Sequence, residues 1–183
     1  MLAVRAYQRA LTKRPLITQM CSAGILAGSG DVIAQLAVEK RKLKNYDLIR
    51  TGRFFVLGSC YVAPVLFRWF RILERIPGNP KVAPLVRLAV DQIAFAPCLL
   101  SGFLINLRIL EGNSPKESFD HWKKEFKGYM LASWKVWPMV QLVNFYLVPL
   151  QYRILVVQTV ALFWNTYIAY RTQKPPDEYY EPY

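Results

Sequence analysis

Apolar residues gather in four long blocks that short charged or proline-bearing segments separate. The blocks cover residues 16–38, 52–73, 84–110 and 133–170. A helix of a soluble core would interrupt such runs with charges at helical spacing, whereas residues 16–38 hold one acid and no base. About 20 apolar residues are enough to cross the hydrocarbon core of a bilayer. The pattern therefore predicts an all-α integral membrane protein, a bundle of four transmembrane helices that forms a single domain over residues 1–174.

The fourth block is too long for one straight span. As a single helix, residues 133–170 would extend roughly 57 Å, nearly twice the thickness of the hydrocarbon core. Pro149, followed by Arg153, predicts a break near residues 149–153. The part after the break then has the length of a span, and residues 134–149 lie partly within the membrane.

Two segments outside the blocks read as amphipathic interfacial helices. Residues 2–14 carry bases at helical spacing and no acid, which fits either a mitochondrial targeting helix or a retained interfacial helix. Residues 115–130 place Phe119, Trp122 and Phe126 among charges. The tail, residues 175–183, is polar and bears prolines, so we expect it to be disordered.

Prolines and glycines within the blocks predict local geometry. Pro64 and Pro97 lie near the middle of the second and third blocks, where each removes a backbone donor and predicts a kink. Gly24 and Gly28 form a GxxxG step, which either allows a second helix to approach closely or arises by chance in an apolar segment.

Composition adds a basic excess to this picture. The chain has 183 residues, 54% of them hydrophobic, and its 24 Lys and Arg against 12 Asp and Glu give a net charge of +12. The bases flank the apolar blocks, so they fit either anionic lipid head groups such as those of cardiolipin or ordinary flanking charge. We expect the lipid bilayer as partner, with a homo-oligomer as a further option, and no direct binding of nucleic acid. The distribution of these basic residues between the two sides of the membrane does not set the orientation of the protein in the membrane.

The chain offers little that resembles catalytic or metal-binding chemistry. HExxH, GxSxG and Cys-His pairings are absent from the sequence, so we expect no enzyme, no cofactor and no metal site. The one histidine, His121, lies among charged residues and has a solvated face as its simplest explanation. Three cysteines, Cys21, Cys60 and Cys98, fall within apolar blocks without a CxxC pair, which is typical of buried thiols in a reducing or non-secretory setting, with a redox switch as the alternative.

Polar side chains inside the apolar blocks are the main candidate functional residues. Such residues cost free energy in lipid and usually face a bundle interior or a wet cavity. They lie close together along the chain, three or four residues apart or adjacent, and several pairs share a helix face. We expect them either to form hydrogen bonds between helices or to line a hydrated path. The set consists of Asp31, Gln35, Asp91, Gln92, Gln141 and Asn144.

Several motifs together resemble the small four-span membrane protein family of mitochondrial inner membranes and peroxisomes. The last third of the chain carries the strongest likeness, in Trp134, Trp137, Pro138, Gln141, Asn144, Phe145, Pro149, Arg153 and Trp164. Earlier matches are Gly30, Asp31, Gln35, Arg50, Arg53, Gly58, Pro64, Trp69, Asp91, Gln92 and Pro97. The chain departs from the family pattern at Val4, Ala63, Phe67 and Phe70. The nearest likeness is to the mitochondrial inner-membrane branch, in which loss of the protein causes mitochondrial DNA depletion.

The resemblance implies a function that the residues alone do not. Resemblance to this family implies a non-selective channel, or channel-like protein, that modulates inner-membrane potential and affects reactive oxygen species and mitochondrial DNA maintenance. Cysteine oxidation is linked to channel behaviour in the family, and Cys60 and Cys98 occupy suitable positions. We therefore expect a channel or channel-like protein of the mitochondrial inner membrane, with the peroxisomal membrane as the alternative location and a non-conducting scaffold or lipid-binding protein as the alternative function.

Overall fold

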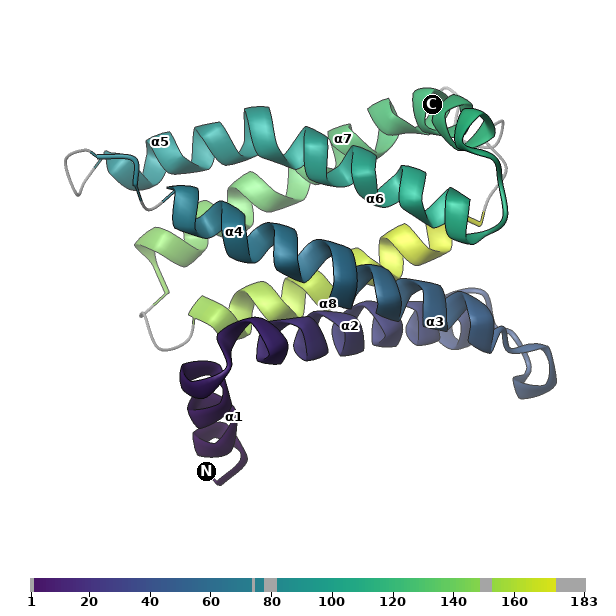
Figure 1. The fold of residues 1–183 in the computed structure, drawn as a ribbon, viewed down its shortest axis with the longest axis horizontal. Coiled ribbons are helices and arrows are strands. Elements are labelled where there is room, and N and C mark those ends of the chain that lie inside the picture. The colour runs from purple at the N-terminus through teal and green to yellow at the C-terminus, as the bar shows by residue number, and fades with distance from the viewer. Residues whose placement is uncertain (1, 74, 78–81, 149–152, 174–183) are drawn as a thin grey trace.

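The computed structural model describes residues 2–73, 75–77, 82–148 and 153–173, and every long element in this part of the chain is a helix (Figure 1). Pro149 and the tail from residue 175 lie outside the described residues. The all-α prediction is confirmed.

Helices follow one another with short connections. Their bounds are α1 Leu2–Lys13, α2 Pro15–Ile33, α3 Leu48–Val56, α4 Ala63–Leu73, α5 Ala83–Val90, α6 Ala96–Leu110, α7 Pro115–Tyr146 and α8 Arg153–Arg171. Wide π-helical turns extend α2 through Ala34–Val38, join α3 to α4 through Leu57–Val62 and join α5 to α6 through Asp91–Phe95. A short 3₁₀ turn, Leu43–Asn45, precedes α3. The chain therefore makes five long helical segments in its described part, with α1 as a short addition at a steep angle to α2 (Figure 1).

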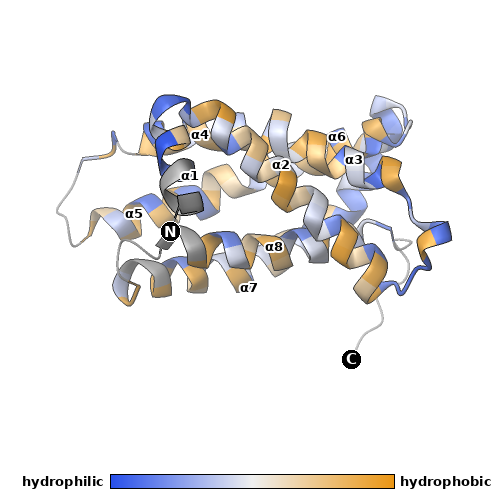
Figure 2. Ribbon diagram, turned by 90° about the horizontal axis from the view of Figure 1, so that it is seen from below, coloured by the Kyte–Doolittle hydropathy of each residue, from blue (hydrophilic) through white to orange (hydrophobic). Residues whose placement is uncertain are grey.

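The five segments form a closed ring. Helix α2 packs against α8, α8 against α7, α7 against α6, and α6 against the turn that joins α3 to α4, which packs against α2 again. Apolar residues cover much of the length of these helices, and polar residues gather toward the two ends of the bundle (Figure 2). Such a distribution suits a protein that exposes its flanks to acyl chains and its ends to head groups.

Three helical segments, not four, are long and apolar enough to cross a membrane within the described residues. They are Pro15–Val38, Leu48–Leu73 and Ala83–Leu110. The prediction of four spans is wrong because the fourth apolar block is divided between two helices. Its first half continues the charged segment from residue 115 as one helix, α7, and its second half forms α8, which Gln158, Asn165 and a terminal Arg171 make less apolar.

Helix α7 begins at a capping box. The Ser114 side chain accepts a hydrogen bond from the Glu117 backbone N–H, and the Glu117 carboxylate accepts from the Ser114 hydroxyl and backbone N–H. These hydrogen bonds, from the hydroxyl first, lower the pKa of Glu117. Residues 115–130, expected to form a separate interfacial helix, instead belong to the first half of a 32-residue helix that contains Pro138.

Each central proline follows a π-helical turn. The turn Leu57–Val62 ends just before Pro64, and the turn Asp91–Phe95 ends just before Pro97. Because proline has no N–H to donate, a backbone carbonyl one wide turn earlier loses its partner. For Pro97 that carbonyl belongs to Gln92, and the Trp134 indole N–H of α7 donates to it at 3.0 Å. A neighbouring helix thus satisfies the freed group, while the kinks themselves stay a prediction.

Glycines allow the ring to close tightly around α2. At Gly24 a side chain would collide with Ser59 and Phe55, whereas Gly28 has ordinary clearance from Phe55. On the opposite contact of α2, a Cβ at Gly30 would lie 2.6 Å from the Cβ of Asn165 on α8 and 2.9 Å from its backbone. The first glycine of the GxxxG step and Gly30 therefore let two different helices approach α2.

We predict opposite effects for the same substitution at two glycines. Gly30→Ala should destabilise the protein by about 1–3 kcal/mol, because backbone and Cβ atoms of α8 cannot move aside. Gly52→Ala, with nothing within 4 Å of the added Cβ, should be neutral or stabilise α3 by about 0.5–1 kcal/mol. Thermal unfolding in detergent micelles, followed by circular dichroism, measures both. A Gly30→Ala protein that melts at or above the wild-type temperature would contradict the close contact of α2 and α8.

Candidate functional site

A buried ion pair joins α2 to α3 at one end of the bundle. The Arg50 Nε lies 2.6 Å from Asp31 Oδ1, and the exposed fractions of the two residues are 1% and 0%. The other carboxylate oxygen, Asp31 Oδ2, accepts hydrogen bonds from Gln35 Nε2 at 2.8 Å and Thr51 Oγ1 at 2.6 Å. Every oxygen of the Asp31 carboxylate therefore has a partner from the protein, which offsets the cost of its burial.

Arg50 reaches two further groups. Its Nη1 donates to Glu39 Oε2 at 3.0 Å, and its Nη2 lies 2.7 Å from Glu39 Oε1. The same Nη2 donates to the backbone carbonyl of Ala169, in the last turn of α8, at 2.8 Å. We call Asp31, Gln35, Glu39, Arg50 and Thr51 the Arg50 network. It connects α2, α3 and α8 with one guanidinium between two carboxylates.

The second arginine at this end binds α8 in the same manner. Arg108 of α6 lies 2.8 Å from Glu111 and 2.9 Å from Glu125 of α7, and its Nη2 donates to the Thr172 carbonyl at 3.0 Å. The carbonyls at the C-terminal end of α8, which have no helical N–H partner, thus accept from Arg50 on one side and from Arg108 on the other.

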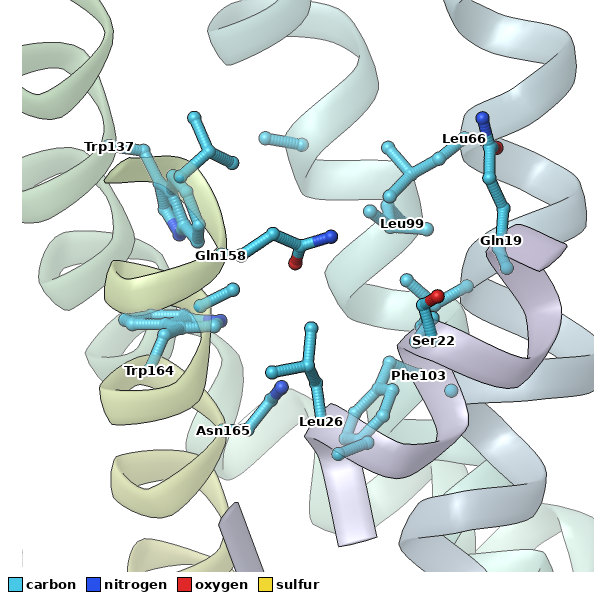
Figure 3. Close-up of a pocket in the computed structure, with 18 of the residues that line it drawn as sticks. Gln19, Ser22, Leu26, Leu66, Leu99, Phe103, Trp137, Gln158, Trp164 and Asn165 are labelled. Carbon is cyan, nitrogen blue, oxygen red and sulfur yellow. The ribbon is translucent and has the colours of Figure 1, made fainter. Parts of the chain in front are cut away.

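A cavity of about 520 Å³ lies inside the ring. Residues from α1, α2, α4, α6, α7 and α8 and from two π-helical turns line it, and apolar side chains such as Leu26, Leu99 and Phe103 form much of the wall (Figure 3). Gln158 and Asn165 of α8 point into the space (Figure 3). Eight polar residues line the cavity: Gln19, Ser22, Asp91, Gln92, Ser133, Gln141, Gln158 and Asn165.

The Arg50 network marks one end of the cavity. On α2 the lining stops at Ala27, one turn before Asp31, and on α8 it stops at Ile168, next to the Ala169 whose carbonyl binds Arg50. At the other end, Tyr7 and Leu11 of α1 contribute to the wall, and the Tyr7 hydroxyl lies 3.1 Å from Ser22 Oγ on α2.

Asp91 carries the charge on the cavity wall. Its Oδ1 accepts from the Trp69 indole N–H at 2.7 Å and its Oδ2 from Gln92 Nε2 at 2.9 Å. Trp69 in turn stacks on Phe95 with ring centroids 4.3 Å apart. Asp91 is half-buried, and no arginine or lysine in the described part of the chain forms an ion pair with it, so its environment differs from that of Asp31, which is paired and fully buried.

The structure separates the polar residues that the sequence put in one set. Asp31 and Gln35 belong to the Arg50 network and do not line the cavity, whereas Asp91, Gln92 and Gln141 do. The side chain of Asn144 lies outside the described residues, as do those of Phe145 and Arg153. Sequence reasoning missed Gln19, Ser133, Gln158 and Asn165 as wall residues, although each is a polar residue in or beside an apolar block, the signal used for the others.

Other predicted motif residues lie around the cavity or away from it. Trp137 and Trp164 both line it and meet edge to face, with ring centroids 6.2 Å apart. Cys60 and Cys98 are free and exposed, as is Cys21, so the prediction of buried thiols is wrong. Among the described residues no group of three His, Cys, Asp or Glu could hold a metal ion. The redox role of the cysteines stays a prediction.

These features define a class: a polytopic helical membrane protein with a cavity between its helices. Within that class, the chain belongs to the Mpv17 / PMP22 family, whose sequence profile matches residues 108–169. No solved structure matches the chain.

Relatives cover almost the whole chain. The mitochondrial inner membrane protein Mpv17 of Caenorhabditis elegans is 46% identical over 178 residues, 97% of either chain. The protein of the same name from Homo sapiens is 42% identical and that from Danio rerio 37%, each covering 93% of this chain and 97% of the relative. With such relatives, the chain is a protein of the mitochondrial inner membrane, as the resemblance implied.

We predict that loss of the Arg50 guanidinium unfolds the ring at this end. Arg50→Gln leaves Asp31 buried without its cation and leaves the partly buried Glu39 with Arg41 alone, which should cost about 3–5 kcal/mol. Arg53→Gln, one turn further along α3, serves as the matched control and should change stability by less than about 1 kcal/mol. The melting temperature and the fraction of monodisperse protein in size-exclusion chromatography measure the difference. Equal stability of the two variants would contradict the role assigned to Arg50.

Proposed function

We propose that the chain is a non-selective channel, or channel-like protein, of the mitochondrial inner membrane, and that the cavity inside the ring is part of its solute path. The observation that supports this function is the cavity of about 520 Å³ with eight polar residues on its wall. Polar side chains are costly in lipid and usually mark water-filled paths or binding sites when they lie inside a bundle.

In this proposal the described conformation is closed at one end. The lining stops at Ala27 and Ile168, and the Arg50 network occupies the next turn of α2, α3 and α8. Solute can pass only if the ring changes its packing there. Opening would then separate charges that are buried together, which makes the closed state the stable one in the absence of a stimulus.

Conduction across the inner membrane would let the protein modulate membrane potential. A leak of ions lowers the stored potential and thereby changes the production of reactive oxygen species, and we propose the maintenance of mitochondrial DNA as a downstream effect. Anionic lipid such as cardiolipin is the proposed environment, since exposed bases such as Lys40, Lys42 and Lys44 lie beyond the end of α2.

The alternative is a non-conducting scaffold or lipid-binding protein. The apolar part of the cavity wall, from Leu26, Leu66, Leu99 and Phe103, favours it, because these side chains suit an acyl chain better than an ion. Purified protein that never conducts but retains an anionic lipid would support this function over the channel.

We predict that Asp91 influences ion preference. Asp91→Asn removes the carboxylate from the wall, so the ratio of potassium to chloride permeability should fall toward one. The reversal potential of single channels, recorded in liposomes of phosphatidylcholine and cardiolipin under a potassium chloride gradient, measures this ratio.

The control is Asp120→Asn, which removes an exposed carboxylate of α7. It should leave the reversal potential unchanged. If Asp91→Asn conducts with wild-type selectivity, Asp91 does not act on the permeating ion.

A further inference from the structure

At Asp91 and Gln92 the cavity wall presents hydrogen-bond acceptors, and no cation in the described part of the chain pairs with them. Among the described residues that line the cavity, Asp91 is the charged one, and none is a lysine or an arginine. Its carboxylate accepts one neutral hydrogen bond on each oxygen, from Trp69 and from Gln92. Each carboxylate oxygen can accept a further hydrogen bond, because it has two lone pairs.

The neighbouring amide adds an acceptor that lacks a partner. Gln92 is 9% exposed, and its Nε2 donates to Asp91. The Oε1 of the same amide can then still accept a hydrogen bond. That Oε1 is buried and has no hydrogen-bond partner among the residues that the structure describes. A buried acceptor that stays unsatisfied costs free energy, and a ligand that brings an N–H group would remove this cost.

Aromatic and other apolar side chains also line the cavity, beside the polar residues already named. Phe95 lies one turn after Asp91, and Trp137 and Trp164 line the cavity from α7 and α8. Aromatic rings attract cations through their faces and at the same time bury apolar groups. The cavity thus combines one negative charge and an unsatisfied carbonyl with walls for an apolar body, and its volume is within the range of small-molecule sites.

We propose that the cavity binds organic ammonium ions, namely protonated primary or secondary amines with an apolar body. The ammonium N–H groups donate to the Asp91 carboxylate and to Gln92 Oε1, and the apolar part packs against the aromatic wall. This inference deepens the proposed function and rests on it, because it names the chemical class of solute that the same cavity takes. Carboxylates and other anions meet repulsion from Asp91, and neutral alcohols leave its charge unpaired.

The test compares three probes of one shape. Benzylammonium, benzyl alcohol and benzoate are titrated into the full-length protein in nanodiscs of neutral phosphatidylcholine, which carries no net charge to attract the cation. Isothermal calorimetry and the tryptophan fluorescence of the protein report binding. Benzylammonium should bind at least about tenfold more tightly than the other two. Equal affinity for benzylammonium and benzoate would overturn the proposal.

A fourth probe tests the hydrogen bonds without any change to the protein. Benzyltrimethylammonium has the same charge but no N–H, so it should bind at least about threefold more weakly than benzylammonium. If the two cations bind equally, the wall recognises charge and shape alone, and the role of Gln92 Oε1 is wrong.

Variants then locate the site. Asp91→Asn should weaken benzylammonium at least about tenfold while Asp120→Asn keeps the wild-type affinity, with size-exclusion chromatography showing that both proteins are folded. A folded Asp91→Asn protein with unchanged affinity would overturn the proposal. Binding at equilibrium is measured separately from conduction, so the two proposals can fail independently. If the protein conducts potassium but does not bind benzylammonium, this inference is wrong and the channel function stands. If it binds benzylammonium but does not conduct, the channel function is wrong and the binding site stands.

Discussion

A single guanidinium buried among helices is the constraint on which the rest of this structure depends. Arg50 is 1% exposed in a bundle whose apolar flanks suit lipid, and its charge is compensated by Asp31 and Glu39 from the same end of α2. It also binds the Ala169 carbonyl of α8. Because separation of α2 from α3 would leave the buried charges of Asp31 and Arg50 without each other, and α8 contributes a carbonyl to the same guanidinium, we expect the three helices to separate together.

The two aspartates of the apolar blocks illustrate different uses of a carboxylate inside a bundle. Asp31 has a cation, an amide and a hydroxyl as partners, so its hydrogen-bonding capacity is used within the protein. Asp91 has two neutral donors and lines a cavity. The first arrangement stabilises helix contacts, and the second leaves electrostatic potential available to something that enters the cavity.

Much of the fold follows from the sequence, because the length and apolar character of residues 16–38, 52–73 and 84–110 are enough to place spanning helices. The continuity of α7 could not be predicted in the same way. The change from a charged to an apolar segment suggested two separate helices, although no helix-breaking residue lies at their junction. Helical spacing placed Asp31 and Gln35 on one face, but it could not supply Arg50, which is distant in sequence. Lone amides such as Gln158 were missed because no partner at helical spacing drew attention to them.

The moderate hydropathy of α8 bears on how the protein is made. This helix carries two amides toward the cavity, has an arginine at its end and makes its most extensive contact with α2, at the far end of the chain. Such a segment gains little from partitioning into lipid alone, so its insertion must rely on a groove that earlier helices have already assembled. Biogenesis would then finish only when α8 docks on α2, and a chain that terminates early would leave Gly30 and Arg50 without their contacts on α8, a signal that quality-control proteases can recognise.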